Sequence, residues 1–212
     1  YREKIRAIPG VVSVVPVSWF GGIYKDQKPE NFFAQFGTDP EEFFKTFRDM
    51  KMPEDQAKAW QRDRQGVIVN DTLAAKYGWK LGDRIVLQGT IYPVNLELNV
   101  RGIFHSVPDN KSVYFNSKYV EEAVPFFKGQ AGTFSILAAS PSEVGKVAST
   151  VDDMFRNSPQ PTKTESEKAF QLSFVAMMGN VKAFILSICS AVVFATLLVS
   201  ANTMAMSIRE RT

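Results

Sequence analysis

The sequence predicts an α+β fold: a domain of two subdomains, followed by one transmembrane helix. Three observations predict it. Short β-branched runs bounded by Gly and Pro indicate strands, and several Asn, Asp or Ser residues before apolar periodic runs indicate capped helices. The third is that residues Ala183 to Ile208 contain no Asp, Glu, Lys, Arg or His. As a helix this stretch is about 39 Å long, more than the roughly 30 Å hydrocarbon core of a bilayer.

Composition excludes several classes of protein. The 212 residues include 25 Lys and Arg against 22 Asp and Glu, a net charge of +3 that gives no electrostatic footprint for nucleic acid. The one cysteine, Cys189, and the one histidine, His105, exclude an internal disulfide, a thiolate cluster and a poly-histidine site. The 17 Phe and a hydrophobic content of 45% exclude disorder. We therefore expect no metal and no cofactor.

The first part of the chain predicts a buried strand and two helices. Residues 11–17 form a β-branched run that starts after the turn Ile8-Pro9-Gly10 and ends before Gly21. Asp39 and Pro40 predict a helix start, with Phe43, Phe44 and Phe47 on one face, and a second helix is expected from Pro53 to Asp63. Phe32, Phe33 and Phe36 fit either a groove or, more often, a core.

The middle of the chain predicts a mainly β unit with one inserted helix. Asn70 is the expected cap of a helix over 71–77, and Gly78 its left-handed stop. Apolar and polar residues alternate from Leu96 to Phe104, as in a half-buried strand. Further strands are expected at 66–69, 84–88 and 112–115, and a short helix at 119–127.

After Gly132 the pattern predicts a β-α-β layer. A strand is expected at 133–139, then a capping box at Ser140 to Glu143, and then a short strand near 162–164. The helix between them should bury one face, made of Val144, Val147, Ala148, Val151, Met154 and Phe155. Pairing with strand 11–17 would give a membrane-near subdomain of 1–24 and 132–165, with 25–131 inserted as a distal subdomain.

The carboxyl-terminal part predicts one helix that runs from water into lipid. We expect a stalk helix at 166–182, a transmembrane helix at 183–208 and the start of a cytoplasmic segment at 209–212. A heptad seam, facing either its own domain or a partner helix, is formed by Phe170, Phe174, Met177, Val181, Phe184, Ile188 and Ala191. Small residues at Ser187, Ala191 and Ala195 predict close helix packing in the membrane.

The residues give little support for an enzyme. Neighbours on an extended strand face opposite ways, so His105 and Ser106 are poorly placed to act as base and nucleophile. The sequence has no G-x-x-x-x-G-K-[ST] phosphate loop. We expect no catalytic residue. The chain starts at Tyr1 without a secretory leader and stops in a charged segment, so we also expect a fragment of a longer protein.

Several motifs resemble those of MacB/FtsX-type ABC transporter permeases. The tail from Asn202 to Arg211 resembles the end of their second transmembrane helix, and Ile8 to Val11 the start of their extracytoplasmic core domain. Residues 67–70, 73–78 and 81–83 look like the middle motif of that domain. The family's Gly-Arg element before this motif is missing here, and Met52 to Asp55 occupy its place.

The resemblance implies a non-catalytic permease subunit with its large domain in the periplasm of a bacterium and its helix in the inner membrane. It also implies a homodimer or pseudo-dimer, contact with membrane lipid, a cytoplasmic ATP-binding subunit or domain, and room for a periplasmic partner protein. Such a subunit would move a lipid-linked or amphipathic cargo or control a partner. The alternative is a membrane-anchored ligand sensor that signals through the stalk helix. Neither the cargo nor the symmetry of the dimer follows from the sequence.

Overall fold

The computed structural model describes residues 1–209, except the side chains of 174, 175, 177–180 and 205–209. The expected cytoplasmic segment 209–212 therefore lies almost wholly outside the described residues. Contacts divide the chain into two compact units, residues 1–147 and residues 148–212, and each is described by itself. We call residues 1–147 the head.

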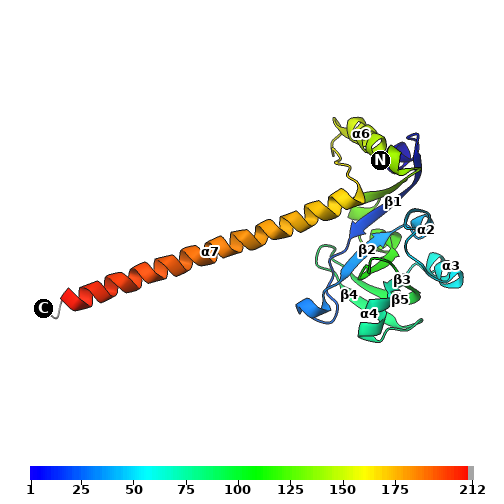
Figure 1. The fold of residues 1–212 in the computed structure, drawn as a ribbon. Coiled ribbons are helices and arrows are strands. Elements are labelled where there is room, and N and C mark those ends of the chain that lie inside the picture. The colour runs from blue at the N-terminus through cyan, green and yellow to red at the C-terminus, as the bar shows by residue number, and fades with distance from the viewer. Residues whose placement is uncertain (210–212) are drawn as a thin grey trace. The chain divides into compact units, whose positions relative to one another are not determined.

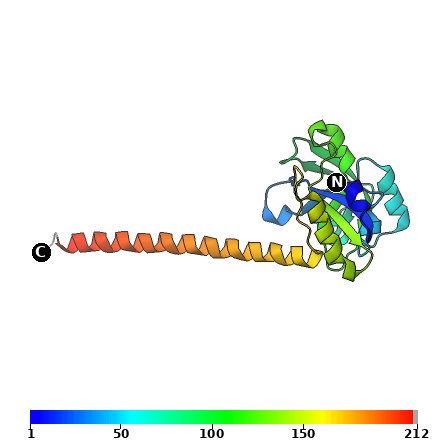
Figure 2. The same ribbon diagram turned by 90° about the horizontal axis from the view of Figure 1, so that it is seen from above.

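The head is one mixed sheet with short helices packed about it (Figures 1 and 2). Its strands are β1 Val11–Trp19, β2 Ala34–Thr38, β3 Gly66–Asn70, β4 Arg84–Gln88, β5 Asn95–Phe104, β6 Ser112–Asn116 and β7 Thr133–Ala138. Its helices are α1 Arg2–Arg6, α2 Phe43–Thr46, α3 Glu54–Arg62, α4 Asp71–Tyr77 and α5 Ser117–Ala123, and single 3-10 turns lie at Pro29–Asn31, Pro125–Phe127 and Pro141–Glu143. Helix α6, Val144–Phe155, crosses from the head into the second unit, and α7 is Glu167–Arg209.

The seven strands follow the order β4-β5-β3-β6-β2-β1-β7. β1 and β7 pair antiparallel, from Val17 opposite Thr133 to Val11 opposite Ala138, as we expected for these two segments. β1 also pairs with β2, so the sheet continues without interruption from the chain ends into the middle of the sequence. The α+β class is confirmed, while the division into a membrane-near and a distal subdomain stays a prediction.

The sheet separates two apolar clusters. Alternate residues of β3 point to opposite faces, so Val67 and Val69 join one cluster and Ile68 the other. The first cluster lies between β3, β4, β5 and the helices α4 and α5, with Leu87 and Leu98 fully buried. The second gathers the aromatic rings of Phe43, Trp60, Phe104 and Tyr114. Because β3 is covered on both faces, all five of its residues are buried.

Some predicted helix ends are confirmed and others are wrong. The Asn70 side-chain oxygen accepts hydrogen bonds from the backbone N–H groups of Thr72 and Leu73, and Gly78 ends α4 with φ at 72°. Asp39, in contrast, does not cap a helix. Its carboxylate accepts from the N–H of Glu41 in a turn, and α2 begins only at Phe43.

The capping box at Ser140 does not form either. The Ser140 hydroxyl makes no capping hydrogen bond, because it lies 2.8 Å from the hydroxyl of Ser142 and pairs with it. The chain then makes a 3-10 turn, and regular α-helix starts only at Val144. A capping residue expected from the sequence thus caps its helix at Asn70, but at Ser140 it pairs with a neighbouring side chain.

Helix α6 buries most of the face that its spacing predicts. Val147, Val151 and Phe155 are buried. The prediction that Met154 is buried on this face is wrong, since 44% of its surface is exposed. The predicted strand near 162–164 is also wrong, because these residues form no regular element. Their polar groups are satisfied by one carboxylate instead of a strand partner.

Candidate functional site

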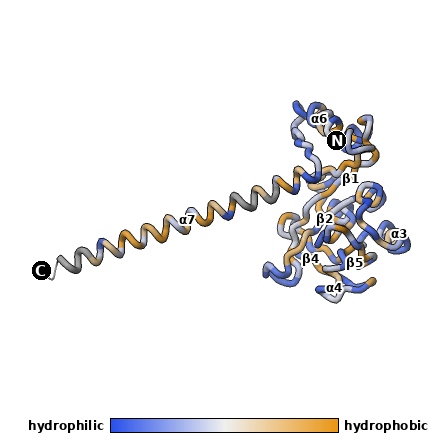
Figure 3. Tube along the Cα trace, in the orientation of Figure 1, coloured by the Kyte–Doolittle hydropathy of each residue, from blue (hydrophilic) through white to orange (hydrophobic). Residues whose placement is uncertain are grey.

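The long helix α7 is the candidate functional element. It contains 43 residues without a break, or about 65 Å at the rise of an ideal α-helix. The Ser166 hydroxyl accepts from the N–H of Ala169, as expected of an N-cap. Figure 3 shows that the middle of the helix is the most apolar part. One helix within residues 1–209, Val181–Met204, is long and apolar enough to cross a membrane by length and composition.

The polar side chains of this apolar stretch are mostly satisfied by the helix itself. Each hydroxyl donates to the carbonyl oxygen four residues earlier, over distances of 2.8–3.1 Å. The residues are Ser187, Ser190, Thr196, Ser200 and Thr203. A hydroxyl bonded in this way needs no water, so these residues are compatible with lipid.

The predicted packing residues all lie on α7 and are exposed where the structure describes them. Ser187, Ala191 and Ala195 follow each other at four-residue spacing along the apolar stretch. Of the predicted seam, Phe170 is 60% exposed and Val181 50% exposed. The side chains of Phe174 and Met177 lie outside the described part. Neither the row nor the seam is tested by these contacts, and both stay predictions.

The segment that leads into α7 is held by Asp152 of α6. The Asp152 carboxylate accepts from the hydroxyl of Thr162 at 3.3 Å, and from the hydroxyl and the N–H of Thr164 at 2.8 and 3.1 Å. The hydrogen bond from Lys163 to Glu165 raises the pKa of Lys163. Sequence reasoning missed this clamp. A carboxylate followed at 10 and 12 residues by two Thr gives no recognised motif.

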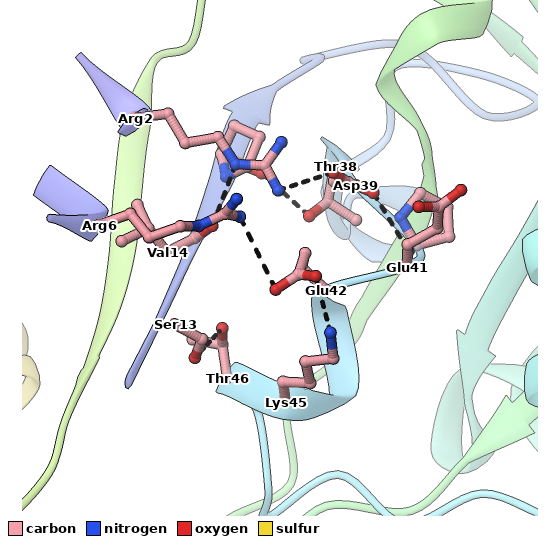
Figure 4. A network of polar contacts seen from close by, with 12 residues as sticks. Arg2, Arg6, Ser13, Val14, Thr38, Asp39, Glu41, Glu42, Lys45 and Thr46 are labelled. Atoms are coloured by element: carbon pink, nitrogen blue, oxygen red, sulfur yellow. Dashed lines mark hydrogen bonds and ion pairs between the residues drawn. The ribbon is translucent and has the colours of Figure 1, made fainter. Parts of the chain in front are cut away.

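In the head, an ion pair anchors the first helix (Figure 4). The Arg2 guanidinium lies 2.8 Å from the carboxylate of Asp39, which follows β2, and its Nε donates to the carbonyl oxygen of Val14 in β1. Ile5 of the same helix is buried beneath these contacts, at 1% exposure. α1 is therefore fixed both by an apolar contact and by a partly buried ion pair.

A second set of contacts extends this network to α2 (Figure 4). Arg6 lies 3.8 Å from Glu42, and Lys45 donates to the other oxygen of Glu42 at 2.8 Å. Ser13 of β1, which is 2% exposed, lies within hydrogen-bond distance of Thr46, with 2.9 Å between the hydroxyls. The start of the chain, β1 and α2 are thus joined side by side.

The head also has a pocket of about 160 Å³ beside the ends of β1, β2 and β6. Aromatic, small and polar residues line it, and burial raises the pKa of the Tyr92 phenol. The lining includes Phe20, Tyr92, Phe115, Phe127, Glu121 and Gln130. The three phenylalanines considered for a groove are not in it: Phe33 is buried in the core, Phe36 is half-buried against Tyr114, and Phe32 is 67% exposed.

His105 and Ser106, the pair considered as base and nucleophile, have separate partners in the described structure. His105 lies 2.6 Å from Asp71 and is exposed, whereas the Ser106 hydroxyl is buried and accepts from the N–H of Asn110. Histidine and serine therefore have separate partners and do not form a nucleophile and base. Among the described residues, no three His, Cys, Asp or Glu side chains are placed to hold a metal ion.

Solved structures with a similar fold include the extracellular domain of an ABC-type transporter, the periplasmic region of MacB and a domain of a putative permease. The extracellular domain of the ABC-type transporter YknZ from Gram-positive bacteria has a TM-score of 0.55 at 11% identity, over 76% of this chain and 83% of its own. The periplasmic region of MacB from Actinobacillus actinomycetemcomitans has a TM-score of 0.51 at 13% identity, over 72% of each chain. A domain of a putative permease from Porphyromonas gingivalis has a TM-score of 0.50 at 14% identity, over 78% of this chain and 83% of its own. At these identities the similarity concerns the fold.

Sequence comparison identifies the family. Residues 1–154 match the profile of the MacB-like periplasmic core domain, and no curated protein matches the sequence significantly. The family match and the apolar helix together indicate an extracytoplasmic domain of an ABC-type permease, with a candidate transmembrane helix. The chain belongs to the MacB-like periplasmic core domain family. This match confirms the resemblance to MacB/FtsX-type permeases noted in the sequence, and a permease of this family implies an ATP-binding subunit.

Proposed function

We propose that this chain is the part of a MacB/FtsX-type permease that couples cytoplasmic ATP hydrolysis to movement of its extracytoplasmic domain. The observation that carries the proposal is the single helix α7, which joins a polar segment and an apolar segment without a break. A continuous helix resists bending because each turn is tied to the next by backbone hydrogen bonds. A displacement at one end of α7 would therefore reach the other end.

In this proposal, the cargo does not cross the bilayer along a pathway lined by α7. Ionisable residues deep inside a membrane usually mark pathways for ions or polar substrates. In Val181–Met204 the one ionisable residue of this kind, Lys182, lies near the end, so the sequence gives no sign of such a pathway along this helix. We propose that the moving domain acts outside the bilayer, on a lipid-linked or amphipathic cargo or on a periplasmic partner protein. The chain itself would contribute no catalytic group.

The assembly that we propose is a homodimer or pseudo-dimer in the bacterial inner membrane. Residues 1–24 and 132–165 would form a membrane-near subdomain, 25–131 a distal subdomain on the periplasmic side, 166–182 the stalk and 183–208 the membrane span. The cytoplasmic ATP-binding subunit would act on the far end of α7. Phe170 and Val181 of the seam and the small-residue row are exposed, which supports helix contacts with other chains.

The proposed transmission of movement along α7 can be tested by breaking the helix. The whole permease with its ATPase is reconstituted in liposomes, and a fluorophore on the head reports its distance from labelled lipid. Insertion of Gly-Pro after Gly179 should leave ATP hydrolysis measurable and abolish the ATP-dependent change in this distance. Insertion of seven helix-forming residues at the same place keeps the helix and, within about 20°, its facing direction. This control should retain the ATP-dependent change in distance. An undiminished change in the Gly-Pro variant would refute the proposal that α7 transmits the movement.

The alternative function, a ligand sensor, is supported by the aromatic pocket of the head. A sensor would need the pocket to be filled for a signal to pass. Replacing Gly37, which lines the pocket, by Ala narrows it, since the added methyl carbon would lie 3.2 Å from the Phe115 ring. If ATP-dependent movement of the head survives this substitution unchanged, the pocket is not part of the signal.

A further inference from the structure

The pocket of the head contains one carboxylate and no basic residue. Of the residues that line it, Glu121 is the one Asp, Glu, Lys, Arg or His. One oxygen of its carboxylate accepts a hydrogen bond from the N–H of Gly129 at 3.2 Å, and the carboxylate forms no ion pair within the described residues. The next residue, Glu122, does not line the pocket and pairs with Arg64 at 3.4 Å. Glu121 therefore offers an unpaired negative charge to a molecule in the pocket.

Helix α5 and the loop after it supply further hydrogen-bond acceptors. Ser117 and Glu121 are four residues apart on α5, so they lie on one face of this helix, and both line the pocket. The Ser117 hydroxyl makes no hydrogen bond within the described residues. Gln130 donates through its amide nitrogen to the carbonyl oxygen of Phe126 at 2.8 Å, so its amide oxygen is left to accept. These acceptors match the three N–H donors of a protonated primary amine.

The apolar side of the pocket is a series of aromatic rings in contact. The Phe20 and Tyr92 rings are stacked, with their centroids 5.6 Å and their planes 9° apart. Phe127 meets Tyr92 edge-on at 4.5 Å, and Phe115 meets Phe20 edge-on at 5.6 Å. Phe20 and Phe115 are each 1% exposed, so these rings are held by the core of the head. A flat ring that enters the pocket therefore meets other rings, against which it can stack.

The size of the pocket limits the ligand to about one ring. Its volume is about 160 Å³, and an apolar cavity of about 150 Å³ is large enough to hold benzene. The pocket is open to solvent on one side, so a short substituent can extend outward from the ring. Glu121 would repel an anionic substituent and attract a cationic one.

We propose that this pocket binds a small organic cation, in which a short chain joins one aromatic ring to a protonated amine. The ring packs against Tyr92 and Phe127, and the ammonium group pairs with Glu121 and donates to Ser117 and Gln130. A cation close to aromatic rings is also attracted by their negative faces. This binding goes beyond the proposed permease function, because it requires no movement of the head. It also names a ligand for the sensor alternative, and only the signalling role of that ligand rests on the proposed function.

Titration of the full chain in detergent with phenethylammonium tests the site. Two probes of nearly the same shape are the matched controls: phenethyl alcohol, which is neutral, and hydrocinnamate, which is anionic. Calorimetry should show saturable binding of the cation and no binding of the anion. The alcohol should bind roughly 5- to 20-fold more weakly than the cation, because a hydrogen bond to a charged group is lost at a partly exposed site. Equal binding of cation and anion, or no saturable binding of the cation, would overturn the proposal.

The contribution of the carboxylate is measured with Glu121→Gln. This variant keeps an oxygen that can accept from Gly129, and it should weaken binding of phenethylammonium by roughly 5- to 20-fold while leaving that of phenethyl alcohol unchanged. Glu122→Gln, the matched control at the exposed neighbouring residue, should bind the cation as the wild type does. Unchanged binding of the cation to Glu121→Gln would overturn the proposal.

A second variant, Phe127→Leu, tests the rings and keeps the proposal falsifiable if Glu121→Gln does not fold. It should weaken binding of the cation and of the alcohol by the same factor, because it removes a ring contact and no charge. Equal binding to Phe127→Leu and to the wild type would contradict the proposed position of the ligand ring. The titration contains neither ATP nor the ATPase. Failure to bind therefore contradicts the pocket alone, and failure of ATP-dependent movement contradicts the permease function alone.

Discussion

At the scale of single residues, Asp63 joins the end of α3 to strand β5. Its carboxylate accepts hydrogen bonds from Arg101 at 2.7 Å, from Asn99 at 3.2 Å and from the N–H of Gln65 at 2.9 Å. Burial alone would raise the pKa of Asp63, but these three donors outweigh it and hold the pKa below its ordinary value. The charged form of this carboxyl therefore stabilises the head.

Asp63→Asn should destabilise the protein at neutral pH and not in acid. A group whose pKa is depressed by folding contributes stability above its unfolded pKa, and this contribution is lost as the pH falls through the folded value. We expect a loss of about 1 kcal/mol at pH 7, which is less than is usual for hydrogen bonds to charged groups, because Arg101 is partly exposed. Denaturant unfolding at pH 7 and at a pH well below 3.8, the ordinary value for Asp, measures it.

The control for this prediction is Asp55→Asn, which changes an exposed carboxyl in the first turn of the same helix. It should lower stability by no more than a few tenths of a kcal/mol at either pH. A loss at Asp63→Asn that is as large in acid as at neutral pH would show that the residue acts through its shape and not its charge.

Some residues with local partners could be predicted from the sequence, although Asp39 and Ser140 were not, and residues with distant partners could not. Asn70 caps the N–H groups two and three residues ahead, and Gly78 needs only its own backbone conformation, so both were predicted correctly. Asp63 meets partners 36 and 38 residues away. Such pairs depend on which strands become neighbours, which a local pattern does not determine.

At the scale of elements, most strands were predicted more closely than the ends of the helices, but β2 was not predicted. Strands β3 to β6 lie within a residue or two of their expected bounds, because each is a short apolar or alternating run between turn residues. The predicted strand near 162–164 failed because its Thr side chains and backbone are bonded to Asp152. Hydrogen bonds to a nearby carboxylate compete with strand pairing, and here they replace it.

The attachment of α1 gives a prediction at the same scale. Arg2→Asp should place two carboxylates together at Asp39 and lower the free energy of unfolding by about 1–2 kcal/mol, since the pair is partly buried. The double change Arg2→Asp with Asp39→Arg should recover at least half of this loss. Thermal unfolding of the purified chain in detergent measures both. If the double variant is no more stable than the single one, the ion pair does not anchor α1.

At the scale of the whole molecule, the sequence predicted the class of protein through its most unusual segment. A charge-free stretch as long as 183–208 has few alternatives to a membrane helix, and the structure forms it as part of α7. What the sequence did not predict is the single continuous sheet, in which β1 lies between β2 and β7. Strand order depends on long-range pairing, and no pattern within one strand encodes it.

The central claim, that α7 carries an uninterrupted membrane span, is tested most directly by spin labels placed one at a time from Val181 to Met204 in liposomes. The account predicts that labels in the middle of this stretch are accessible to oxygen and not to a water-soluble nickel reagent. It also predicts that oxygen accessibility oscillates with a period of about 3.6 residues, lowest on the face of Ala191 and Ala195. Access of the nickel reagent across the middle of the stretch, or loss of the helical period within it, would contradict the account.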